Sequence, residues 1–415
     1  MTNNDFTTVK DFGAIGDGSA NNATINRNAF NAAFKAVSLT GQTLYIPAGV
    51  YMINNTISLT IKTGCKDIGI VCDPGAVIKA TAKFQVDSKM IGFLAPVAKA
   101  TEPPNLANIS FKWHGGTIDG RLLPTKVGNY APDGMAVNGN DGHINKVDIS
   151  NLKIILNDTR QGNAGDTCLG IVASDVNITN CIFQGAVDAG IYNSGDNTTK
   201  HGKRIHISGN TFIECNVGFI TKRGYQDHII EGNFFENCSV ACVVGGTAGR
   251  GDAGVGGLVR GGYKAIIANN IVKNVSQGLS LRLSDDSMIV NNKIEDYGIN
   301  KLGVVENNCA IDIKGSNRCI VSNNVTSFSG DFVPHPYAVA VRINKDSPKS
   351  LGTFLSTYNL ITNNIFTAPI DKINWAVEEV KDGGGDYNIA SNNLVVGFKT
   401  PYNMLGTNSN KSLLA

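Results

Sequence analysis

The sequence has few charged residues and few aromatic ones. Asp, Glu, Lys and Arg make up 17% of its 415 residues, and Phe, Trp and Tyr make up 7%. Exposed helices favour Glu, Lys and Arg, so a surface built mainly from Asn, Gly, Ser and Thr suits stacked strands better. The net charge of +2 excludes a global polycation that would attract nucleic acid. No apolar run approaches the roughly 18 residues of a membrane span, so we expect no membrane partner.

Signals for disulfides, bound metals and secretion are also absent. The nine cysteines include no CxxC pair and no metal-like spacing, and their odd number argues against a complete disulfide framework. Most of them lie in or beside apolar strand-like segments, which predicts buried thiols. The first residues lack the basic and apolar regions of a secretory signal peptide. We therefore predict no resident metal and no signal peptide in this chain.

Paired amides recur beside short apolar segments, as in CIVSNNVTSF, MIVNNKI and LITNNIF. The second position of each pair falls at Cys181 (after Asn180), Asn210, Asn233, Asn270, Asn292, Asn324, Asn364 and Asn393. The spacing between successive positions runs from 22 to 40 residues, which indicates a solenoid with loops of different length. Helical periodicity is absent within the repeats, so the solenoid is predicted to consist of parallel strands about 4.8 Å apart.

The repeated amides predict an internal asparagine ladder. An Asn side chain tolerates left-handed backbone angles, and its amide can both donate to and accept from the next rung. The open first rung needs a cover. A helix is predicted there, because Ile25, Ala29, Phe30, Ala33, Phe34 and Val37 share one helical face. We predict one domain over residues 1–415: an N-terminal cap region (1–43), coils (44–400) and a C-terminal tail (401–415).

Three stretches carry a family resemblance: VKDFGAIGDG (9–18), LYIPAGVYMI (44–53) and GGTIDGR (115–121). They resemble the pectin-lyase-like right-handed parallel β-helix superfamily of polygalacturonases, polysaccharide lyases and phage tailspike depolymerases. The resemblance implies an all-β, right-handed parallel β-helix with an N-terminal capping helix, and action on polysaccharides. The Gly-His-Gly pattern of polygalacturonases and the Asp-Pro-His pattern of alginate epimerases are both missing. The resemblance therefore leaves the reaction open.

A column of cations is predicted along one face of the coils. Side chains alternate along a strand, so the third and fifth positions of the strands that begin with Gly or Ala point outward. The fifth positions are Lys222, Gly245, Arg282, Lys314 and Arg342. Stacked like charges repel, so the column favours an acidic polysaccharide lying along it. The alternative is compensation by acidic neighbours through ion pairs: Asp285, Asp286, Asp312 and Glu378.

Two aspartates on adjacent coils are the predicted catalytic pair for hydrolysis. Asp166 precedes the glycine of its strand by four residues, and Asp188 precedes its own by two. An offset of about 6.6 Å along the strand and one rung of about 4.8 Å predict a Cα separation of roughly 8 Å. This suits the roughly 6.5–9.5 Å carboxyl spacing of an inverting glycosidase. Solvated turn aspartates are the plain alternative.

Elimination would use the cations differently. An arginine or a bound Ca²⁺ would neutralise a uronate carboxylate, while Lys222, Arg223 or Tyr192 removed the proton from the adjacent carbon. Asp285 and Asp286 are the best candidates for such a calcium site. No other cofactor is expected.

Taken together, the sequence predicts a carbohydrate-active enzyme that cleaves glycosidic bonds of an acidic polysaccharide, with hydrolysis favoured. A uronate lyase or epimerase is the first alternative, and a non-catalytic glycan-binding spike or adhesin is the second. His228 is kept as a further contributor. From the resemblance we expect a virion-associated or secreted protein, with a homotrimer as one option. The predicted substrate-binding residues are Tyr192, Arg282, Asp312, Lys314 and Arg342.

Overall fold

The computed structural model describes most of the chain, which divides into two compact units. Unit 1 comprises Met1–Asp196 with Glu214–Asn216, and unit 2 comprises Asn197–Ile213 with Val217–Ala415. The described residues are 6–85, 89–95, 108–123, 132–138, 144–157, 167–194, 203–222, 226–245, 264–299, 308–329, 335, 337–347, 352–370, 372–380 and 385–413. A single domain over residues 1–415 stays a prediction.

Unit 1 begins with the predicted capping helix, α1 (Ala23–Thr40). Phe30, Phe34 and Val37 are fully buried, and the rings of Phe34 and Phe93 lie 4.9 Å apart. Ile25 is the exception on the predicted face, because 46% of it is exposed. The helix ends where Gly41 adopts a left-handed conformation and donates its N–H to the carbonyl of Val37.

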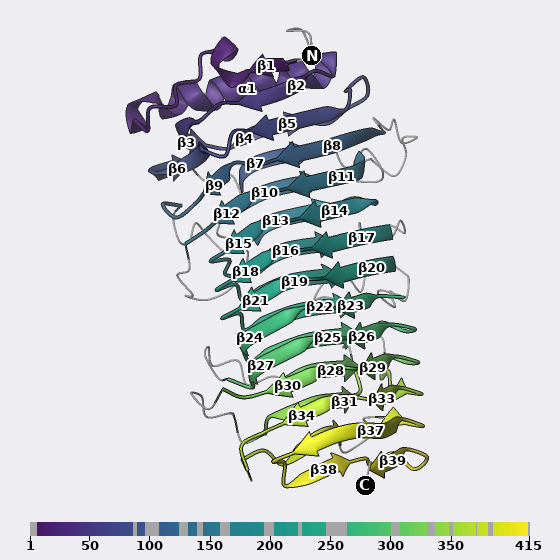
Figure 1. The fold of residues 1–415 in the computed structure, drawn as a ribbon. Helices are drawn as coiled ribbons and strands as arrows, with labels where there is room; N and C mark the ends of the chain where they lie inside the picture. The colour runs from purple at the N-terminus through teal and green to yellow at the C-terminus, as the bar shows by residue number, and fades with distance from the viewer. Residues whose placement is uncertain are drawn as a thin grey trace. The chain divides into compact units, whose positions relative to one another are not determined.

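Behind the helix, the chain passes repeatedly through three parallel sheets, named A, B and C (Figure 1). Sheet A of unit 1 contains β1 (Phe6–Thr8), β2 (Thr43–Ile46), β5 (Ile68–Cys72), β8 (Ile109–His114), β11 (Ile144–Ser150) and β14 (Val176–Thr179). Sheet B contains β3 (Gly49–Asn55), β6 (Ala76–Gln85), β9 (Thr117–Asp119), β12 (Lys153–Ile155) and β15 (Ile182–Gln184). Sheet C contains β4 (Ile57–Thr60), β7 (Lys89–Leu94), β10 (Asp133–Asn138), β13 (Thr167–Val172) and β16 (Ala189–Ser194).

Unit 2 repeats the same order of strands (Figure 1). Sheet A contains β17 (Lys203–Ser208), β20 (Gln226–Glu231), β23 (Ile266–Ala268), β26 (Met288–Val290), β29 (Ile320–Ser322), β33 (Leu360–Thr362), β37 (Ile389–Val396) and β39 (Asn410–Leu413). Sheet B contains β18 (Thr211–Ile213), β21 (Phe234–Glu236), β24 (Ile271–Val275), β27 (Lys293–Tyr297), β30 (Val325–Ser327), β34 (Ile365–Thr367) and the second half of β37. Sheet C contains β19 (Val217–Lys222), β22 (Val240–Gly245), β25 (Gln277–Arg282), β28 (Cys309–Lys314), β31 (Val339–Asn344), β35 (Trp375–Glu379) and β38 (Thr400–Asn403). A short pair, β32 (Ser356–Thr357) and β36 (Gly385–Asp386), lies apart from these sheets. The predicted fold, a right-handed parallel β-helix, is confirmed.

The asparagine ladder is confirmed in unit 2, where each buried Asn donates its amide to the side-chain oxygen of the next. The six Nδ2–Oδ1 distances are 3.1, 3.0, 2.9, 3.0, 3.0 and 2.9 Å. The ladder runs through Asn210, Asn233, Asn270, Asn292, Asn324, Asn364 and Asn393. The same oxygens also accept the backbone N–H of the preceding ladder residue. They therefore replace, at the turn, the backbone acceptors that a strand would provide.

The first amide of each pair has a different task. Asn291, Asn323 and Asn363 have φ angles of 57°, 56° and 57°, in the left-handed region that Asn tolerates better than most residues. Asn323 is exposed, whereas Asn324 is buried. One amide therefore turns the chain, and the other ties the coils together.

A second inward polar column, which the sequence analysis missed, lies at the turn between sheets C and A. The N–H of Cys319 donates to Oδ1 of Asn359, and Nδ2 of Asn359 donates to Oδ1 of Asn388 at 3.0 Å. On the preceding coil, Oγ of Ser287 accepts the N–H of Ala265. The column mixes Ser, Cys and Asn, so no repeated residue type reveals it in the sequence.

The end of the chain continues the coils further than expected. Strands β38 and β39 pair with β35 and β37, so the predicted tail at 401–415 contains two further strands. Near these last strands, the buried carboxylate of Glu379 accepts hydrogen bonds from Nδ2 of Asn388, Oγ of Ser409 and the N–H of Gly406.

The predicted burial of the cysteines is confirmed, because all nine are buried and none forms a disulfide. None of the helices in the described ranges is long and apolar enough to span a membrane.

The ladder predicts opposite outcomes for the two members of one amide pair. Asn324→Ala removes the acceptor for two buried donors of Asn292, and we expect the free energy of unfolding to fall by at least about 2 kcal/mol. Asn323→Gly is the matched control, because Gly adopts positive φ freely, and we expect a change below about 0.5 kcal/mol. Thermal melting followed by circular dichroism measures both. Equal melting temperatures for the two variants would contradict the assignment.

Candidate functional site

The outward face of sheet C in unit 2 carries a column of polar side chains. Leu279, Ile311 and Val341 pair in register and point inward, where all three are fully buried. The positions one residue further along point outward and are also in register from coil to coil. This outward column contains Val243, Ser280, Asp312, Arg342, Glu378 and Asn403.

The register corrects the predicted cation column in one place. Arg342 pairs with Asp312, and Lys314 pairs with Asn344. Arg342 therefore lies in the outward column with Asp312 and not in line with Arg282 and Lys314. The segment AVAVR has two alanines that could begin the repeat, and the sequence-based frame chose Ala338, two residues too early. The prediction of which side chains point outward was unaffected, because a shift of two residues leaves each side chain on the same face of the sheet.

Two of the predicted substrate-binding arginines are neutralised within the protein. Nε and Nη2 of Arg282 donate to the two carboxylate oxygens of Asp346 at 2.7 and 3.1 Å. Nε of Arg342 donates to Oε2 of Glu378 at 3.2 Å, and its Nη2 donates to the carbonyl of Tyr337. The charges of these arginines are therefore compensated by carboxylates of the protein, and their assignment as substrate-binding residues stays a prediction. Asp346 had no signal in the sequence, because it lies 64 residues beyond Arg282.

Lys314 is the cation of this face that forms no ion pair with a described residue. It is part-exposed and ends β28, directly beside Arg282 on the preceding coil. Its positive charge opposes the rise in pKa that burial causes at Asp312, which is on the same strand. Lys314 therefore retains the potential to contact an anionic group of a ligand.

Asp312 lies at the centre of the polar column and is 1% exposed. Its Oδ2 accepts hydrogen bonds from Nε2 of Gln277 at 3.1 Å and from Oγ of Ser280 at 3.4 Å. Its Oδ1 has no hydrogen-bond partner among the described residues. Burial raises the pKa of this carboxyl above its ordinary value, and the positive charges of Lys314 and Arg342 oppose the rise without cancelling it.

Asp285 and Asp286, the predicted calcium candidates, hold an arginine. Both oxygens of Asp286 accept from Arg318, at 2.6 and 2.9 Å, and this hydrogen bonding lowers the pKa of Asp286. Asp285 is buried and accepts from the N–H and Nδ2 of Asn317. The described residues contain no group of three His, Cys, Asp or Glu side chains that could hold a metal ion. A calcium requirement stays a prediction.

In unit 1, the outward face of sheet C is lined by small residues up to Tyr192. Its column contains Ser58, Gly92, Ala136, Gly170 and Tyr192. A side chain added at Gly170 would meet nothing within 4 Å, so there is open space beside part-exposed Tyr192 on the neighbouring rung. Tyr192 therefore has room for a ligand against one side.

The register also corrects the frame used for the predicted aspartate pair. Gly170 pairs with Tyr192, and Thr167 pairs with Ala189, so Gly170 does not align with Gly190 as assumed. The predicted separation of roughly 8 Å loses its basis, because it assumed an offset of two residues. Asp188 is part-exposed and directly precedes β16, whereas Asp166 lies outside the described residues. The pair stays a prediction.

The other predicted catalytic residues have different surroundings. Lys222 ends β19 and is part-exposed, and Arg223 lies outside the described residues. His228 points into the core of unit 2 and is fully buried. Burial lowers its pKa to about 3, so its imidazole is neutral at ordinary pH. His228 is a core residue.

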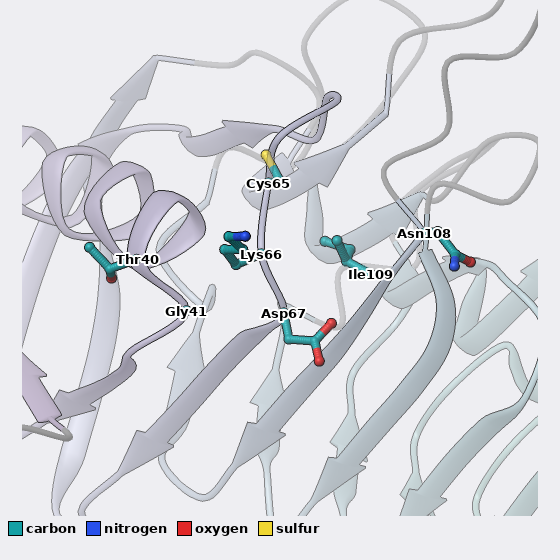
Figure 2. A pocket seen from close by; sticks show the side chains of 7 residues that line it. All are labelled: Thr40, Gly41, Cys65, Lys66, Asp67, Asn108 and Ile109. Carbon is teal, nitrogen blue, oxygen red and sulfur yellow. The ribbon is translucent and has the colours of Figure 1, made fainter.

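A cavity of about 460 Å³ lies in unit 1, away from sheet C. Figure 2 shows that its lining comes from the end of α1, the loop around Lys66 and the start of β8. The carboxylate of Asp67 already accepts the N–H of Ser110 at 2.8 Å. None of the predicted catalytic or substrate-binding residues lines this cavity.

Asp312 and the part-exposed Asp386 predict opposite effects of pH on stability. The folded-state pKa of Asp312 is raised above 3.8, so its ionisation costs stability as pH rises through that window. We expect the stability of Asp312→Asn relative to wild type to increase between pH 4 and neutral pH. The pKa of Asp386 is lowered by hydrogen bonds from Asn408, so Asp386→Asn should lose stability relative to wild type as pH rises. Denaturation with urea at several pH values measures both slopes, and slopes of the same sign would contradict this account.

Comparison with known proteins places the fold. The sequence pattern of a family described as rhamnogalacturonase A/epimerase, pectate lyase-like, matches residues 6–242, which is more than half of the chain. No match to a curated protein is found.

Solved structures show the same fold at low sequence identity. The A-module of the Azotobacter vinelandii mannuronan C-5 epimerase AlgE6 has a TM-score of 0.61 at 17% identity, over 98% of this chain and 97% of that one. The Dettilon tailspike protein gp208 has a TM-score of 0.65 at 14% identity, over 99% and 69%. A family 28 exopolygalacturonase of Yersinia enterocolitica has a TM-score of 0.53 at 12% identity, over 98% and 77%. Since the family pattern covers most of unit 1 and the start of unit 2, this chain belongs to the rhamnogalacturonase A/epimerase, pectate lyase-like family of the pectin-lyase-like β-helix superfamily.

Proposed function

We propose that this protein binds a polysaccharide along the outward face of sheet C and cleaves its glycosidic bonds, with hydrolysis as the favoured reaction. The observation that carries the proposal is the surface of unit 1, where Tyr192 stands beside the open space over Gly170 and Asp188 precedes the same strand. A tyrosine ring beside open space suits the apolar face of a sugar, because the ring is amphipathic and rigid. Membership of the family supports a polysaccharide as the ligand.

In this proposal, Asp166 and Asp188 carry out the proton transfers. One carboxyl protonates the leaving glycosidic oxygen, and the other carboxylate either takes a proton from the attacking water or attacks the anomeric carbon itself, depending on the distance between the two carboxyls. Tyr192 holds the sugar beside them. Lys314 contacts an acidic group of the glycan in unit 2, since it forms no ion pair with a described residue.

Asp312 has a supporting role here, because a carboxyl that is 1% exposed does not touch a ligand on the surface. It lies in register with Arg342, and its pKa responds to the charges of Arg342 and Lys314. It therefore acts as a positioning residue for the cations of this face.

A binding-only function is the second candidate. Arg282 and Arg342 already have carboxylate partners, so a ligand gains less from them than from unpaired cations. A glycan-binding spike needs no catalytic pair. In either case we propose a virion-associated or secreted protein, with a homotrimer as one option for its assembly.

The first experiment is incubation with a panel of acidic and neutral polysaccharides, following reducing ends and ultraviolet absorbance together. Hydrolysis produces reducing ends without a rise in absorbance, and this is the expected result. A parallel rise in absorbance would show elimination, because that reaction leaves an unsaturated sugar. Loss of that second signal on addition of EDTA would support a calcium requirement. Retention of a glycan without either signal would favour the binding-only function.

Replacement of the aspartates tests the proposed roles. We expect Asp166→Asn and Asp188→Asn each to lower kcat for hydrolysis by roughly 100-fold or more, because each removes a proton-transfer group. Asp227→Asn, on sheet A of unit 2, is the control and should keep full activity. Unchanged turnover in both aspartate variants would overturn the assignment of the catalytic pair. A lyase would retain activity, and glycan binding without catalysis would be unaffected.

A further inference from the structure

The outward face of sheet A in unit 2 carries an unbroken aliphatic column. Its members pair in register over six successive strands, and their inward neighbours fill the core. We name this column the sheet A stripe: Ile229, Ile266, Met288, Ile320, Leu360 and Ile389. Ile229, Ile266 and Ile389 are 39%, 37% and 46% exposed. The strands that present the stripe, from β20 to β37, follow one another in Figure 1.

No charged residue interrupts the sheet A stripe, in contrast to the equivalent column on sheet B. There, Lys293 stands between Ile271 and Val325 and forms an ion pair with Glu295. Solvent-facing strand positions ordinarily carry polar side chains. A continuous apolar surface with a polar border marks an interaction site.

Two exposed tyrosines extend the stripe at its C-terminal end. Tyr358 and Tyr387 precede Leu360 and Ile389 by two residues, and they are 58% and 46% exposed. Their rings are stacked, with centroids 4.9 Å apart and planes at 11°. Both residues have positive φ, 59° and 55°, which is unfavourable for a bulky side chain. The same turn position has positive φ on preceding coils too, as at Asp286 and Arg318, so the two exposed rings are what distinguishes this end of the stripe.

The sheet A stripe has charged residues on one side and, over its last three coils, hydroxyl groups on the other side. On one side lies the turn column that ends in the two tyrosines, and its charges alternate in sign from coil to coil. The alternating members are Arg204, Asp227, Lys264, Asp286 and Arg318. On the other side are the hydroxyl groups of Ser322, Thr362 and Ser391. An apolar centre with aromatic anchors and a polar border is the composition of a protein–protein interface.

The repeat of the stripe indicates what covers it. Its side chains recur at about 4.8 Å over about 24 Å, so they form an elongated apolar surface of regular spacing. Ridges with this spacing fit best against a surface with the same spacing, and a second copy of this chain provides one. Alternating charges on the border also permit apposition of two copies, because no block of like charge accumulates. Sugar hydroxyls, in contrast, would find no hydrogen-bond partner along six aliphatic residues.

We propose that the sheet A stripe, with Tyr358 and Tyr387, is an interface between copies of this chain. The stripe and the candidate functional site of unit 2 lie on different sheets, so association through the stripe leaves the outward face of sheet C open to ligand. The interface concerns the proposed assembly of copies and is independent of the proposed cleavage, since none of its residues contributes to cleavage or to glycan binding on sheet C.

Sedimentation equilibrium of the full chain over a wide concentration range tests the proposal. Wild type should sediment as a multiple of the chain mass. The double variant Ile266→Lys/Ile320→Lys places two charges in the stripe, and we expect it to raise the dissociation constant by roughly 100-fold or more. Ile271→Lys is the matched control, because Ile271 is 41% exposed on sheet B of the same coil, and it should associate like wild type.

A second double variant separates association from folding. Asn tolerates positive φ better than Tyr, so Tyr358→Asn/Tyr387→Asn should fold with a melting temperature at least equal to that of the monomer, yet associate more weakly. The proposal is overturned if wild type is monomeric throughout, if the tyrosine variant is folded and associates as tightly as wild type, or if Ile271→Lys dissociates as much as the stripe variant.

Discussion

The asparagine ladder is the constraint on which the arrangement of unit 2 depends. Each ladder amide is tied to the next coil by two hydrogen bonds to one oxygen, as between Asn292 and Asn324. A turn fixed in this way sets the register of the strands on either side, because a strand advances by about 3.3 Å per residue. Strands therefore stay in register whether successive ladder residues are 22 or 40 positions apart in the sequence. Loops of different length leave the sheets unaffected because they leave the ladder unaffected.

The features that could be predicted from the sequence are those that repeat a residue type or follow a short period. The ladder positions from Asn210 to Asn393 were predicted correctly, and so was the helix with Phe30 and Phe34 inside. Which face each strand side chain takes was also predicted, since alternation has a period of two. Register was predicted less well, because a slip of two residues preserves every face. Ala338 and Ala340 are equally good starting points by pattern, and only the hydrogen bonds distinguish them.

Charge pairing in the candidate site depends on contacts that no local pattern contains. Arg282 meets Asp346, which comes from a segment that follows a strand two coils further on. Asp285 and Asp286 follow Arg282 closely in the sequence, yet they bind Arg318 and not the column on sheet C. The burial that raises the pKa of Asp312 arises in the same way, from side chains of neighbouring coils such as Gln277. Sequence proximity in a solenoid is a poor guide to which charges meet, because each residue has its nearest neighbours one coil away.

The coils separate structural positions from positions that face a partner. The ladder amides bond to one another within the protein, so a change there disturbs every sheet that the turn holds in register. Outward columns share one backbone geometry whatever side chain they carry: Arg318, Tyr358 and Tyr387 occupy equivalent turn positions with φ of 56°, 59° and 55°. Substitutions in the outward columns of sheets A and C should therefore act locally and nearly additively, because these columns touch different neighbours. One β-helix can in this way carry a ligand surface on one sheet and an association surface on another, each altered without moving the other.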